Sequence, residues 1–418
     1  MNILVLGGGG REHSICHALS KSKNIGKVYC APGNAGIALV SRIAKIDSDN
    51  FTSISKFCKK RKINMVIPGS EEYLDKGISD FLKMEGISVI GPSKQASSLE
   101  TSKIFTKKVC AMSKIKTAKW IVCDNAKHAK KIIEEKRFPL VIKMDSLAAG
   151  KGVIVAKTIK EAKKFLNNII KGDLGNSNSK IIIEECLVGE EGSFFFAVDG
   201  TSAKFLGSAK DYKRAADGNK GLNTGGMGCI SPSPRETSQI VTRIMKNIIK
   251  PTLNTMQDLG YPFTGFLYAG VMFTKKGIYL IEYNVRLGDP ECQVVIGRIK
   301  NSFLDICIAL QKKSLKNLKI NLSNEVSSCI VLASNGYPQK YKKGIKINGL
   351  KSFKNKENIM VYHAGTQRDN KGNYITSGGR VLNIVSKARS IKKALALVYE
   401  VCKSVYWKGY FYRKDIGS

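Results

Sequence analysis

The sequence predicts a multidomain protein in which α/β and α+β regions follow one another. Its 418 residues are too many for one ordinary hydrophobic core, so two to four domains are expected. Strand-like and helix-like segments alternate over residues 1–92, which is typical of a parallel sheet with right-handed crossovers. Beyond residue 112 the pattern changes to strands separated by glycine-rich loops, which indicates a second kind of domain.

The first region, residues 1–101, is predicted to be an N-terminal parallel-sheet domain. Short apolar runs mark its strands, and apolar residues at helical spacing mark its helices. The expected strands are residues 3–6, 27–31, 65–67 and 89–90, and the expected helices are residues 11–22, 51–61 and 74–84.

The second region, residues 102–295, is predicted to contain a smaller α+β unit at about residues 120–190. The expected strands are residues 139–143, 152–156, 181–185, 194–198, 266–273 and 278–283, the last two as an antiparallel pair, and the expected shorter helices are residues 103–112 and 161–170. A long helix is expected at residues 235–259, with Pro251 kinking or interrupting it because proline cannot donate the helical hydrogen bond.

The third region, residues 326–418, is predicted to be a C-terminal mixed α/β domain. A polar stretch at residues 315–325 is the candidate linker that leads into it. Its expected strands lie near residues 329–333 and 381–385, and its closing helix covers residues 390–402.

The composition excludes several classes of protein. No apolar run approaches the roughly 18–20 residues of a membrane span, and the N-terminus lacks the basic and apolar segments of a signal peptide. The 11 cysteines are scattered without a C-x-x-C pair and only four histidines are present, so no zinc site is expected. Dispersed, unpaired cysteines are typical of a reducing compartment, and we expect a cytoplasmic protein.

The formal charge of +36 has two explanations. One is binding to nucleic acid or another anionic surface. The other is compositional drift, because Lys, Ile and Asn are abundant throughout while Trp (2) and Pro (10) are rare. The lysines are spread over helix faces instead of forming one basic block with aromatic residues between them, which favours drift.

The most informative run is residues 282–293, EYNVRLGDPECQ, which follows a strand-like stretch at residues 277–281. Alternate residues of a strand point to one face, so Glu282, Asn284 and Arg286 are expected to project together. A carboxylate, an amide oxygen and a guanidinium on one face suit a hard cation beside an anion, and Mg²⁺ keeps phosphates in its shell. A surface strand with a charged outer face is the alternative.

Four glycines at residues 7–10 follow the first strand and open the first helix, where backbone N–H groups and the helix dipole favour an anion. Arg11 adds a guanidinium that can bind phosphate. A dinucleotide-binding site would have an acidic residue at the end of the second strand, but residues 29–32 are YCAP. A small phosphorylated substrate is therefore favoured, with a purely structural turn as the alternative.

Two further glycine-rich loops occur downstream. Residues 143–152, KMDSLAAGKG, lie between two expected strands and differ from a P-loop, because Gly152 rather than Ser or Thr follows the lysine. Lys143 can reach nucleotide phosphates from its strand while the loop supplies backbone donors. Residues 223–228, NTGGMG, follow the charged residues 210–214, and this combination suggests a lid that orders over substrate.

Nine blocks follow one another along the chain: GGGGREH, APGN, KMDSLAAGKGV, EECLVGEE, NTGGMG, EYNVRLGDPE, HAGT, SGGRV and RKDIG. In this order they resemble the phosphoribosylamine–glycine ligase family, also called glycinamide ribonucleotide synthetases, of the ATP-grasp superfamily. The resemblance extends from Met1 to about Gly417. It implies an N-terminal pre-ATP-grasp domain, an ATP-grasp domain with a small mobile subdomain, and a C-terminal domain.

The resemblance also implies a reaction, the second step of de novo purine synthesis. ATP phosphorylates the carboxylate of glycine, and the amine of 5-phosphoribosylamine attacks the resulting glycyl phosphate to give glycinamide ribonucleotide, ADP and phosphate. A carboxylate and a triphosphate repel each other, so cations must offset their charge. The acyl phosphate must be kept from water, which gives the glycine-rich loops a reason to close.

The resemblance further implies residue roles. Glu282 and Asn284 would hold Mg²⁺ or Mn²⁺ against ATP, and Arg286, with Asp211 and Lys213 nearby, would orient glycine or the transferring phosphoryl group. The implied ATP-binding residues are Lys103, Lys143, Gly150, Lys151 and Gly152 at the phosphates, Glu185 and Leu187 at the adenine hinge, and Glu190 or Glu191 at the ribose. The implied phosphoribosylamine-binding residues are Gly9, Arg11, Glu12, Asn34 and Glu71.

Several positions depart from the family pattern, among them Ser146, Tyr212 and Cys292. Ser146 stands where a glycine is usual, and a non-glycine residue is uncommon where φ is positive. None of the departures removes an implied metal ligand or a phosphate-facing lysine, so we expect activity.

Three other functions compete with this interpretation. Another ATP-grasp ligase, such as a biotin-dependent carboxylase, is disfavoured by the GREH and NTGGMG blocks. A basic nucleic-acid-binding protein would need clustered Lys and Arg with stacking aromatic residues. A nicotinamide-dependent oxidoreductase rests only on the first glycine loop. We expect a monomer that binds glycine, 5-phosphoribosylamine and ATP, with no specific nucleic acid and no membrane partner.

Overall fold

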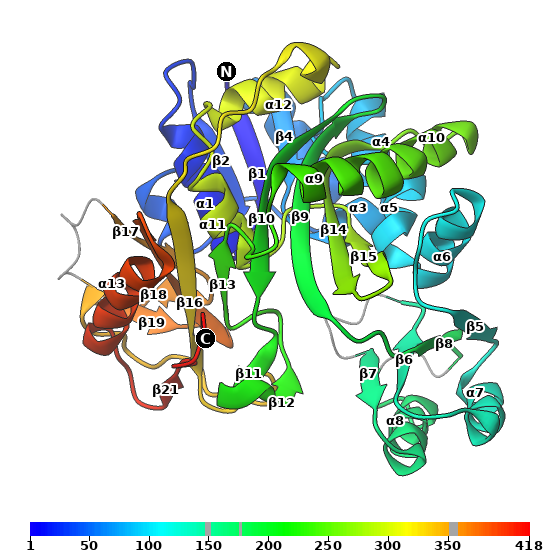
Figure 1. The fold of residues 1–418 in the computed structure, drawn as a ribbon. Helices are drawn as coiled ribbons and strands as arrows, with labels where there is room; N and C mark the ends of the chain where they lie inside the picture. Colours follow the sequence, from blue (N-terminus) through cyan, green and yellow to red (C-terminus); the bar gives the residue numbers. More distant parts are fainter. Residues whose placement is uncertain (147–151, 175–177, 351–357) are drawn as a thin grey trace.

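The computed structural model describes residues 1–146, 152–174, 178–350 and 358–418. In these residues the strands form a four-stranded sheet near the N-terminus, a nine-stranded sheet through the middle of the molecule, a second four-stranded sheet in a protruding unit, and two two-stranded ribbons (Figure 1). The predicted N-terminal parallel sheet and the mixed α/β character of the remaining chain are confirmed.

The N-terminal sheet has the strand order β3-β2-β1-β4, and all of its pairs are parallel. Its elements are β1 (Ile3–Gly7), α1 (Gly10–Ser20), β2 (Val28–Pro32), β3 (Arg42–Ile43), α2 (Phe51–Arg61), β4 (Met65–Pro68), α3 (Glu71–Asp75), α4 (Ile78–Met84) and α5 (Lys94–Thr101). Strand β1 is buried on both faces: Ile3 and Val5 belong to one apolar core, and Leu4 and Leu6 belong to another. This two-sided burial explains its uninterrupted apolar sequence.

Two predictions in this region are wrong. The helix expected at residues 74–84 is divided into α3 and α4, because Gly77 adopts a left-handed φ of 88° before α4. The strand expected at residues 89–90 makes only an isolated bridge, from Val89 to Val66. Helix α5 and the short strand β3 lie outside the predicted elements.

The central and C-terminal regions share the nine-stranded sheet. Its path is β15 (Gly277–Asn284), β14 (Thr264–Thr274), β9 (Glu190–Asp199), β10 (Ala203–Asp211), β13 (Gly228–Ser231), β16 (Val326–Ser334), β20 (Arg380–Ala388) and β17 (Ile359–His363), with β21 (Tyr410–Phe411) beside β16. Strand β13 pairs with β10 on one side and β16 on the other, so the C-terminal strands extend the central sheet. The antiparallel pair expected at residues 266–273 and 278–283 is confirmed as β14 and β15.

A small subdomain protrudes at the lower right of Figure 1. Its sheet has the order β5-β8-β6-β7 and is antiparallel throughout. Its elements are β5 (Trp120–Cys123), α7 (Ala126–Ile132), β6 (Leu140–Met144), β7 (Val153–Ala156), α8 (Ile159–Ile170) and β8 (Ile181–Glu185). Helix α8 buries Ala162, Phe165, Leu166 and Ile169, a helical spacing that turns one face to this sheet. The rest of the described chain forms the body of the molecule.

The helix expected at residues 235–259 is present as three consecutive helical segments. They are α9 (Ser238–Ile244), a π-helical turn (Met245–Ile249) and α10 (Lys250–Asp258). Pro251 lies in the first turn of α10, where proline is tolerated. The proline therefore accompanies a change of helical type and not a break.

The remaining helices and strands complete the body. They are α6 (Lys103–Met112), β11 (Arg214–Ala216), β12 (Lys220–Asn223), α11 (Glu291–Ile296), α12 (Phe303–Gln311), β18 (Thr366–Arg368), β19 (Tyr374–Thr376) and α13 (Ile391–Ser404). Of the helices that the structure describes, none is both long and apolar enough to cross a membrane.

Candidate active site

Strand β15 presents the two predicted metal ligands. Glu282 lies opposite Gly270 of β14, and Asn284 lies opposite Tyr268, so the two side chains are two residues apart on one face. Gly270 makes room for the Glu282 side chain, because a Cβ at that position would lie 3.2 Å from Cγ of Glu282 and 3.1 Å from the Tyr268 hydroxyl. The strand ends at Asn284, so the alternation predicted to bring Arg286 onto this face does not reach it.

Lysine ammonium groups surround Glu282. The Nζ of Lys213 lies 3.4 Å from its carboxylate, at a partly exposed position. Burial would raise the pKa of Glu282, but Lys213, Lys143 and Lys103 together hold that pKa below its usual value. Glu282 in turn raises the pKa of Lys213 well above its usual value. The carboxylate is therefore ionised near neutral pH. The ammonium groups of the three lysines near it could neutralise the charge of an anionic ligand.

Glu282 and Asn284 together suit a metal ion that takes most of its ligands from a bound phosphorylated compound and from water. Glu282 offers a carboxylate and Asn284 an amide oxygen, which suits a hard divalent cation that keeps phosphates and water in its shell. Among the residues that the structure describes, no three His, Cys, Asp or Glu side chains gather into a metal-binding group. The two side chains therefore provide part of a metal-binding site, and the oxygens of a phosphorylated ligand would complete it.

The small subdomain and helix α6 supply the other predicted phosphate contacts. Lys143 lies in β6, and Lys103 of α6 donates from its Nζ to the backbone carbonyl of Ser146 at 3.0 Å. Ser146 does not have a positive φ, so the serine at this position introduces no left-handed strain. Gly152 is buried and lies directly before β7. Gly150 and Lys151 lie outside the described residues.

The residues predicted for adenine and ribose lie at the end of β8, in the connection that follows it and at the start of β9. The carboxylate of Glu185 accepts a hydrogen bond from the backbone N–H of Lys119 at 2.9 Å. Leu187 lies in this connection, just before Val188, which is 83% exposed. The side chain of Glu185 is thus occupied within the chain, which leaves backbone groups of the connection for a base.

The structure distinguishes the two candidate ribose ligands. Glu190 forms an ion pair with Arg235. The carboxylate of Glu191 lies 3.8 Å from the Nζ of Lys213. Consecutive strand residues point to opposite faces, so Glu191 is the one that shares the face of Lys213 and Glu282.

Asp211, at the end of β10, is an unusual carboxyl group. Its Oδ1 is buried and has no hydrogen-bond partner in the described chain. Burial, followed by the charge of Glu291, raises the pKa of Asp211 well above its usual value. The pKa of Glu291 is itself raised by burial. The two carboxyl groups thus raise each other's tendency to hold a proton, and Glu291 is a residue that no sequence prediction singled out.

Arg286 lies between two carboxylates from the N-terminal region. Its Nε donates to Glu71 at 2.9 Å and its Nη2 donates to Glu100 at 2.8 Å. Burial raises the pKa of Glu100 to about 7, whereas Arg286 and Arg11 outweigh burial at Glu71 and lower its pKa to about 2. Glu100 also accepts the backbone N–H of Val285, so it holds the segment that follows β15.

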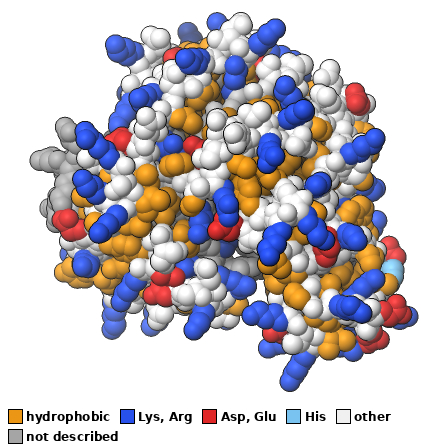
Figure 2. Space-filling view, viewed as in Figure 1, with side chains coloured by type: hydrophobic (Ala, Val, Ile, Leu, Met, Phe, Trp, Pro, Cys, Tyr) orange, Lys and Arg blue, Asp and Glu red, His pale blue; other side chains and the backbone are white. Residues whose placement is uncertain are grey.

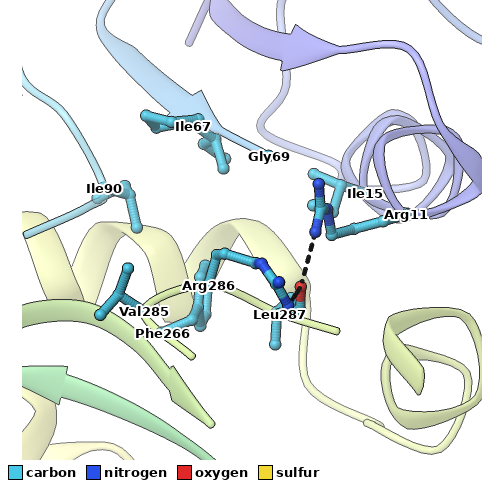
Figure 3. Close-up of a pocket in the computed structure, with 10 residues that line it drawn as sticks. Arg11, Ile15, Ile67, Gly69, Ile90, Phe266, Val285, Arg286 and Leu287 are labelled. Atoms are coloured by element: carbon cyan, nitrogen blue, oxygen red, sulfur yellow. Dashed lines mark hydrogen bonds between the residues drawn. The ribbon is translucent and has the colours of Figure 1, made fainter. Parts of the chain in front are cut away.

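Figure 3 shows Arg11 and Arg286 approaching the carbonyl of Leu287 from opposite sides of a small cavity. Arg11 donates to this oxygen at 3.2 Å and Arg286 at 3.5 Å. The cavity, which Gly69 also lines, measures about 10 Å³, roughly the space of one water molecule. Arg286 and Arg11 therefore belong to one cluster. Arg286 is predicted to orient glycine or the transferring phosphoryl group, and Arg11 is predicted to bind phosphoribosylamine.

Two other residues predicted to bind phosphoribosylamine, Glu12 and Asn34, form hydrogen bonds with other residues of the protein. Glu12 accepts hydrogen bonds from the backbone N–H of Gly9 at 2.6 Å and from Nε of Arg11 at 2.7 Å. Asn34 uses its whole amide: it donates to the carbonyls of residues 8 and 363 and accepts from the N–H groups of residues 36 and 37. These side chains shape the glycine loop around the site.

Glu100 and Glu291 were missed for different reasons. Glu100 lies in α5, whose start carried a usable signal, because Ser93 caps the helix by accepting the N–H of Ala96. Glu291 belongs to the run of residues 282–293 and begins α11, but nothing in its spacing shows that its charge acts on Asp211 of β10.

The positive charge of the protein is distributed. Figure 2 shows Lys and Arg side chains scattered over the visible face, with apolar and uncharged surface between them. A single basic band would be the footprint of a nucleic-acid site. This face does not favour that alternative.

Comparisons with known proteins agree with the site. The phosphoribosylglycinamide synthetase family matches the chain in three consecutive parts: its N domain at residues 1–100, its ATP-grasp (A) domain at residues 101–292 and its C domain at residues 327–418. A phosphoribosylamine–glycine ligase of Brucella melitensis is 42% identical over 417 residues, covering 100% of this chain and 97% of that protein. That of Caldanaerobacter subterraneus is 40% identical over 419 residues, covering 100% of both.

Solved structures show the same architecture. The crystal structure of phosphoribosylamine–glycine ligase from Thermotoga maritima is 29% identical, with a TM-score of 0.86 over 99% of this chain and 100% of that chain. A biotin carboxylase from Campylobacter jejuni, 16% identical, has a TM-score of 0.71 over 98% of this chain and 92% of that chain, which is a likeness of fold alone.

The fold, with its lysine-lined strand β15 and small subdomain, is that of an ATP-grasp protein. Within that class, the chain belongs to the phosphoribosylglycinamide synthetase family, whose three domains match it almost from end to end. The family and the three-part architecture predicted from the nine sequence blocks are confirmed.

Proposed function

We propose that this protein ligates glycine to 5-phosphoribosylamine with ATP, giving glycinamide ribonucleotide, ADP and phosphate. Relatives that carry the name phosphoribosylamine–glycine ligase match the whole chain at 40–42% identity, which supports the reaction. The observation that carries the proposal is the arrangement around Glu282. Strand β15 carries two potential metal ligands, and the charges of three lysines act on one of them, Glu282. The cluster of Arg286, Arg11 and Glu71 lies just beyond the end of this strand.

The arrangement suits activation of a carboxylate by phosphorylation. Glycine becomes reactive when ATP converts its carboxylate to glycyl phosphate, and the amine of phosphoribosylamine then displaces phosphate. Lys103, Lys143 and Lys213 offset the charge that builds up when a carboxylate approaches a triphosphate. A divalent cation held by Glu282 and Asn284 would add Lewis-acid stabilisation of the transferring phosphoryl group.

The chain's own residues divide the remaining work. Arg286, held by Glu71 and Glu100, orients glycine or the transferring phosphoryl group, with Asp211 and Lys213 nearby. Of the two candidates for the ribose hydroxyls, Glu191 is favoured over Glu190 because it adjoins Lys213. The backbone of residues 185–187 contacts adenine, and Gly150, Lys151 and Gly152 contact the phosphates of ATP.

Phosphoribosylamine is assigned to the N-terminal side of the site. Arg11 and Glu71 contact it, and Gly9, Glu12 and Asn34 shape the loop that receives its phosphate. We place the domain boundaries at residues 1–101, 102–295 and 326–418, with the small subdomain at about residues 120–190.

The test is release of ADP by the purified protein with ATP, Mg²⁺, glycine and freshly generated phosphoribosylamine, each omitted in turn. We expect ADP only when all four are present, together with glycinamide ribonucleotide seen by mass spectrometry. ADP release that does not depend on glycine or phosphoribosylamine would point instead to another ATP-grasp carboxylate–amine ligase. Absence of ADP release under every condition would contradict the proposal.

A further inference from the structure

Helix α6 carries a buried lysine that has no part in the proposed reaction. Lys107 is only 2% exposed, and its Nζ lies 3.2 Å from Oε1 of Glu184 in β8. The Nζ of Lys143, in β6, lies 3.0 Å from the same oxygen, and both of these residues are buried as well. Two ammonium groups thus share one carboxylate oxygen in the interior, where an unpaired charge is strongly destabilising.

The same lysine also contacts the body. Its Nζ donates to the hydroxyl of Thr117 at 2.6 Å, and that hydroxyl donates to the carbonyl of Leu280 in β15 at 2.8 Å. Leu280 is two residues before Glu282. An unbroken series of contacts therefore runs from the strand of the predicted metal ligands, through Thr117 and Lys107, to Glu184 and Lys143 of the small subdomain.

The sharing of Glu184 has a consequence for Lys143. Burial lowers the pKa of Lys107, and the Glu184 carboxylate acts in the opposite direction. While both lysines are charged, the carboxylate cannot neutralise Lys143 completely, and net positive charge remains for a phosphate. Without Lys107, Glu184 would pair with Lys143 alone and draw its ammonium group away from an anionic ligand.

We propose that Lys107 is a positioning residue for nucleotide binding. By sharing Glu184 it keeps the ammonium of Lys143 available to ATP, and by binding Thr117 it holds the small subdomain against β15. Lys103 lies one turn earlier on the same helix, so two lysines four residues apart tie α6 to different parts of the small subdomain. The inference rests on the proposed function, because it takes ATP as the ligand of Lys143.

The test compares Lys107→Met with Lys108→Met, which alters an exposed lysine of the same helix. Binding of MgADP is measured by calorimetry, and KM values are measured for ATP and glycine. We expect Lys107→Met to raise the Kd for MgADP and the KM for ATP about 10-fold, with the KM for glycine unchanged, as for the loss of other supporting contacts behind a ligand-binding group. Lys107→Arg keeps the charge and should recover most of the affinity.

Nucleotide affinity in Lys107→Met equal to that in Lys108→Met would overturn the inference, even with a lower melting temperature, because a merely structural lysine changes stability without a selective loss of ATP. If Lys107→Met does not fold, Thr117→Val removes the hydroxyl that Lys107 binds and should weaken MgADP in the same direction; unchanged affinity there would overturn the inference equally. A protein of unaltered sequence that neither binds MgADP nor forms ADP would contradict the proposed function instead, so the two failures are distinguishable.

Discussion

The body and the small subdomain build their apolar cores differently. One core of the body includes Ile3 from the N-terminal sheet, Phe195 from the central strands and Val385 from the C-terminal strands. The core of the small subdomain draws its fully buried members only from residues 123–183. Among the residues that the structure describes, buried apolar contacts therefore join all three regions of the body without continuing into the small subdomain, and we expect the latter to unfold as a separate cooperative unit.

The candidate site crosses this division. Glu282, Lys213 and Arg286 belong to the body, whereas Lys143 belongs to the small subdomain. The two units meet at α6 through ion pairs and hydrogen bonds, which re-form more easily than packed side chains. Three predictions test this difference, in order of decreasing effect.

The largest effect is expected on the body side of the site. Glu282→Gln removes the carboxylate predicted to hold the metal ion, and we expect ligation to fall at least about 1000-fold, because several kcal/mol of charge stabilisation would be lost. Melting of both units should stay close to that of the unaltered protein, since Glu282 is partly exposed. Steady-state ADP release measures the loss, with Glu85→Gln, at an exposed ion pair, as the control. Near-normal turnover of Glu282→Gln would remove Glu282 from the metal site.

The second effect separates the two cores. Leu166 of α8 and Leu304 of α12 are both fully buried helical leucines, the first in the small subdomain and the second in the body. Each change to alanine should cost roughly 3 kcal/mol, because it removes apolar contacts and leaves a cavity. Hydrogen exchange followed by mass spectrometry should show faster exchange of residues 120–185 alone in Leu166→Ala, and of the body in Leu304→Ala. Faster exchange throughout the chain in both variants would mean that the two units unfold together.

The smallest effect concerns the buried charges of the body. The pKa of Glu100 is raised by burial from 4.5 to about 7, so the folded protein holds this proton more tightly than the unfolded chain. The stability that the protonated form contributes is fully present below about pH 4.5 and is lost as the pH rises through about 7. Relative to Glu100→Gln, the unaltered protein should therefore become less stable over this range, by roughly 2–4 °C in melting temperature.

Thermal unfolding of both proteins from pH 4.5 to 8 measures this difference. Glu72→Gln, at an exposed position of α3, is the control and should show no such trend. A difference in melting temperature that is constant with pH, or that grows in the opposite direction, would contradict a raised pKa at Glu100.

Much of the local structure could be predicted from the sequence. Helices α2 and α6 begin and end where the apolar spacing predicts, and β15 carries Glu282 and Asn284 on one face as alternation requires. These features depend on neighbours a few residues apart, so the spacing of residue types is enough to reveal them. The division of the helix at residues 74–84 was missed because a single glycine, Gly77, is compatible with either result until its φ is known.

Partners that lie far apart in the chain were not predictable in this way. Arg286 meets Glu71 and Glu100, which are more than 180 residues away in sequence. Lys107 meets Glu184 across the junction of the two units. Spacing says which residues share a face, but not which other segment will lie against that face.

The sequence by itself determined the family, many of the helices and strands that follow local periodicity, and the strand that carries the candidate metal ligands. These depend on residue order and on local periodicity, which the chain carries before it folds. Only the tertiary structure decided that the C-terminal strands continue the central sheet, that Glu191 and not Glu190 faces Lys213, and that Lys107 joins the small subdomain to the body. Those outcomes depend on which surfaces exclude water from each other when distant segments pack, and the burial of charges in pairs then results from that packing.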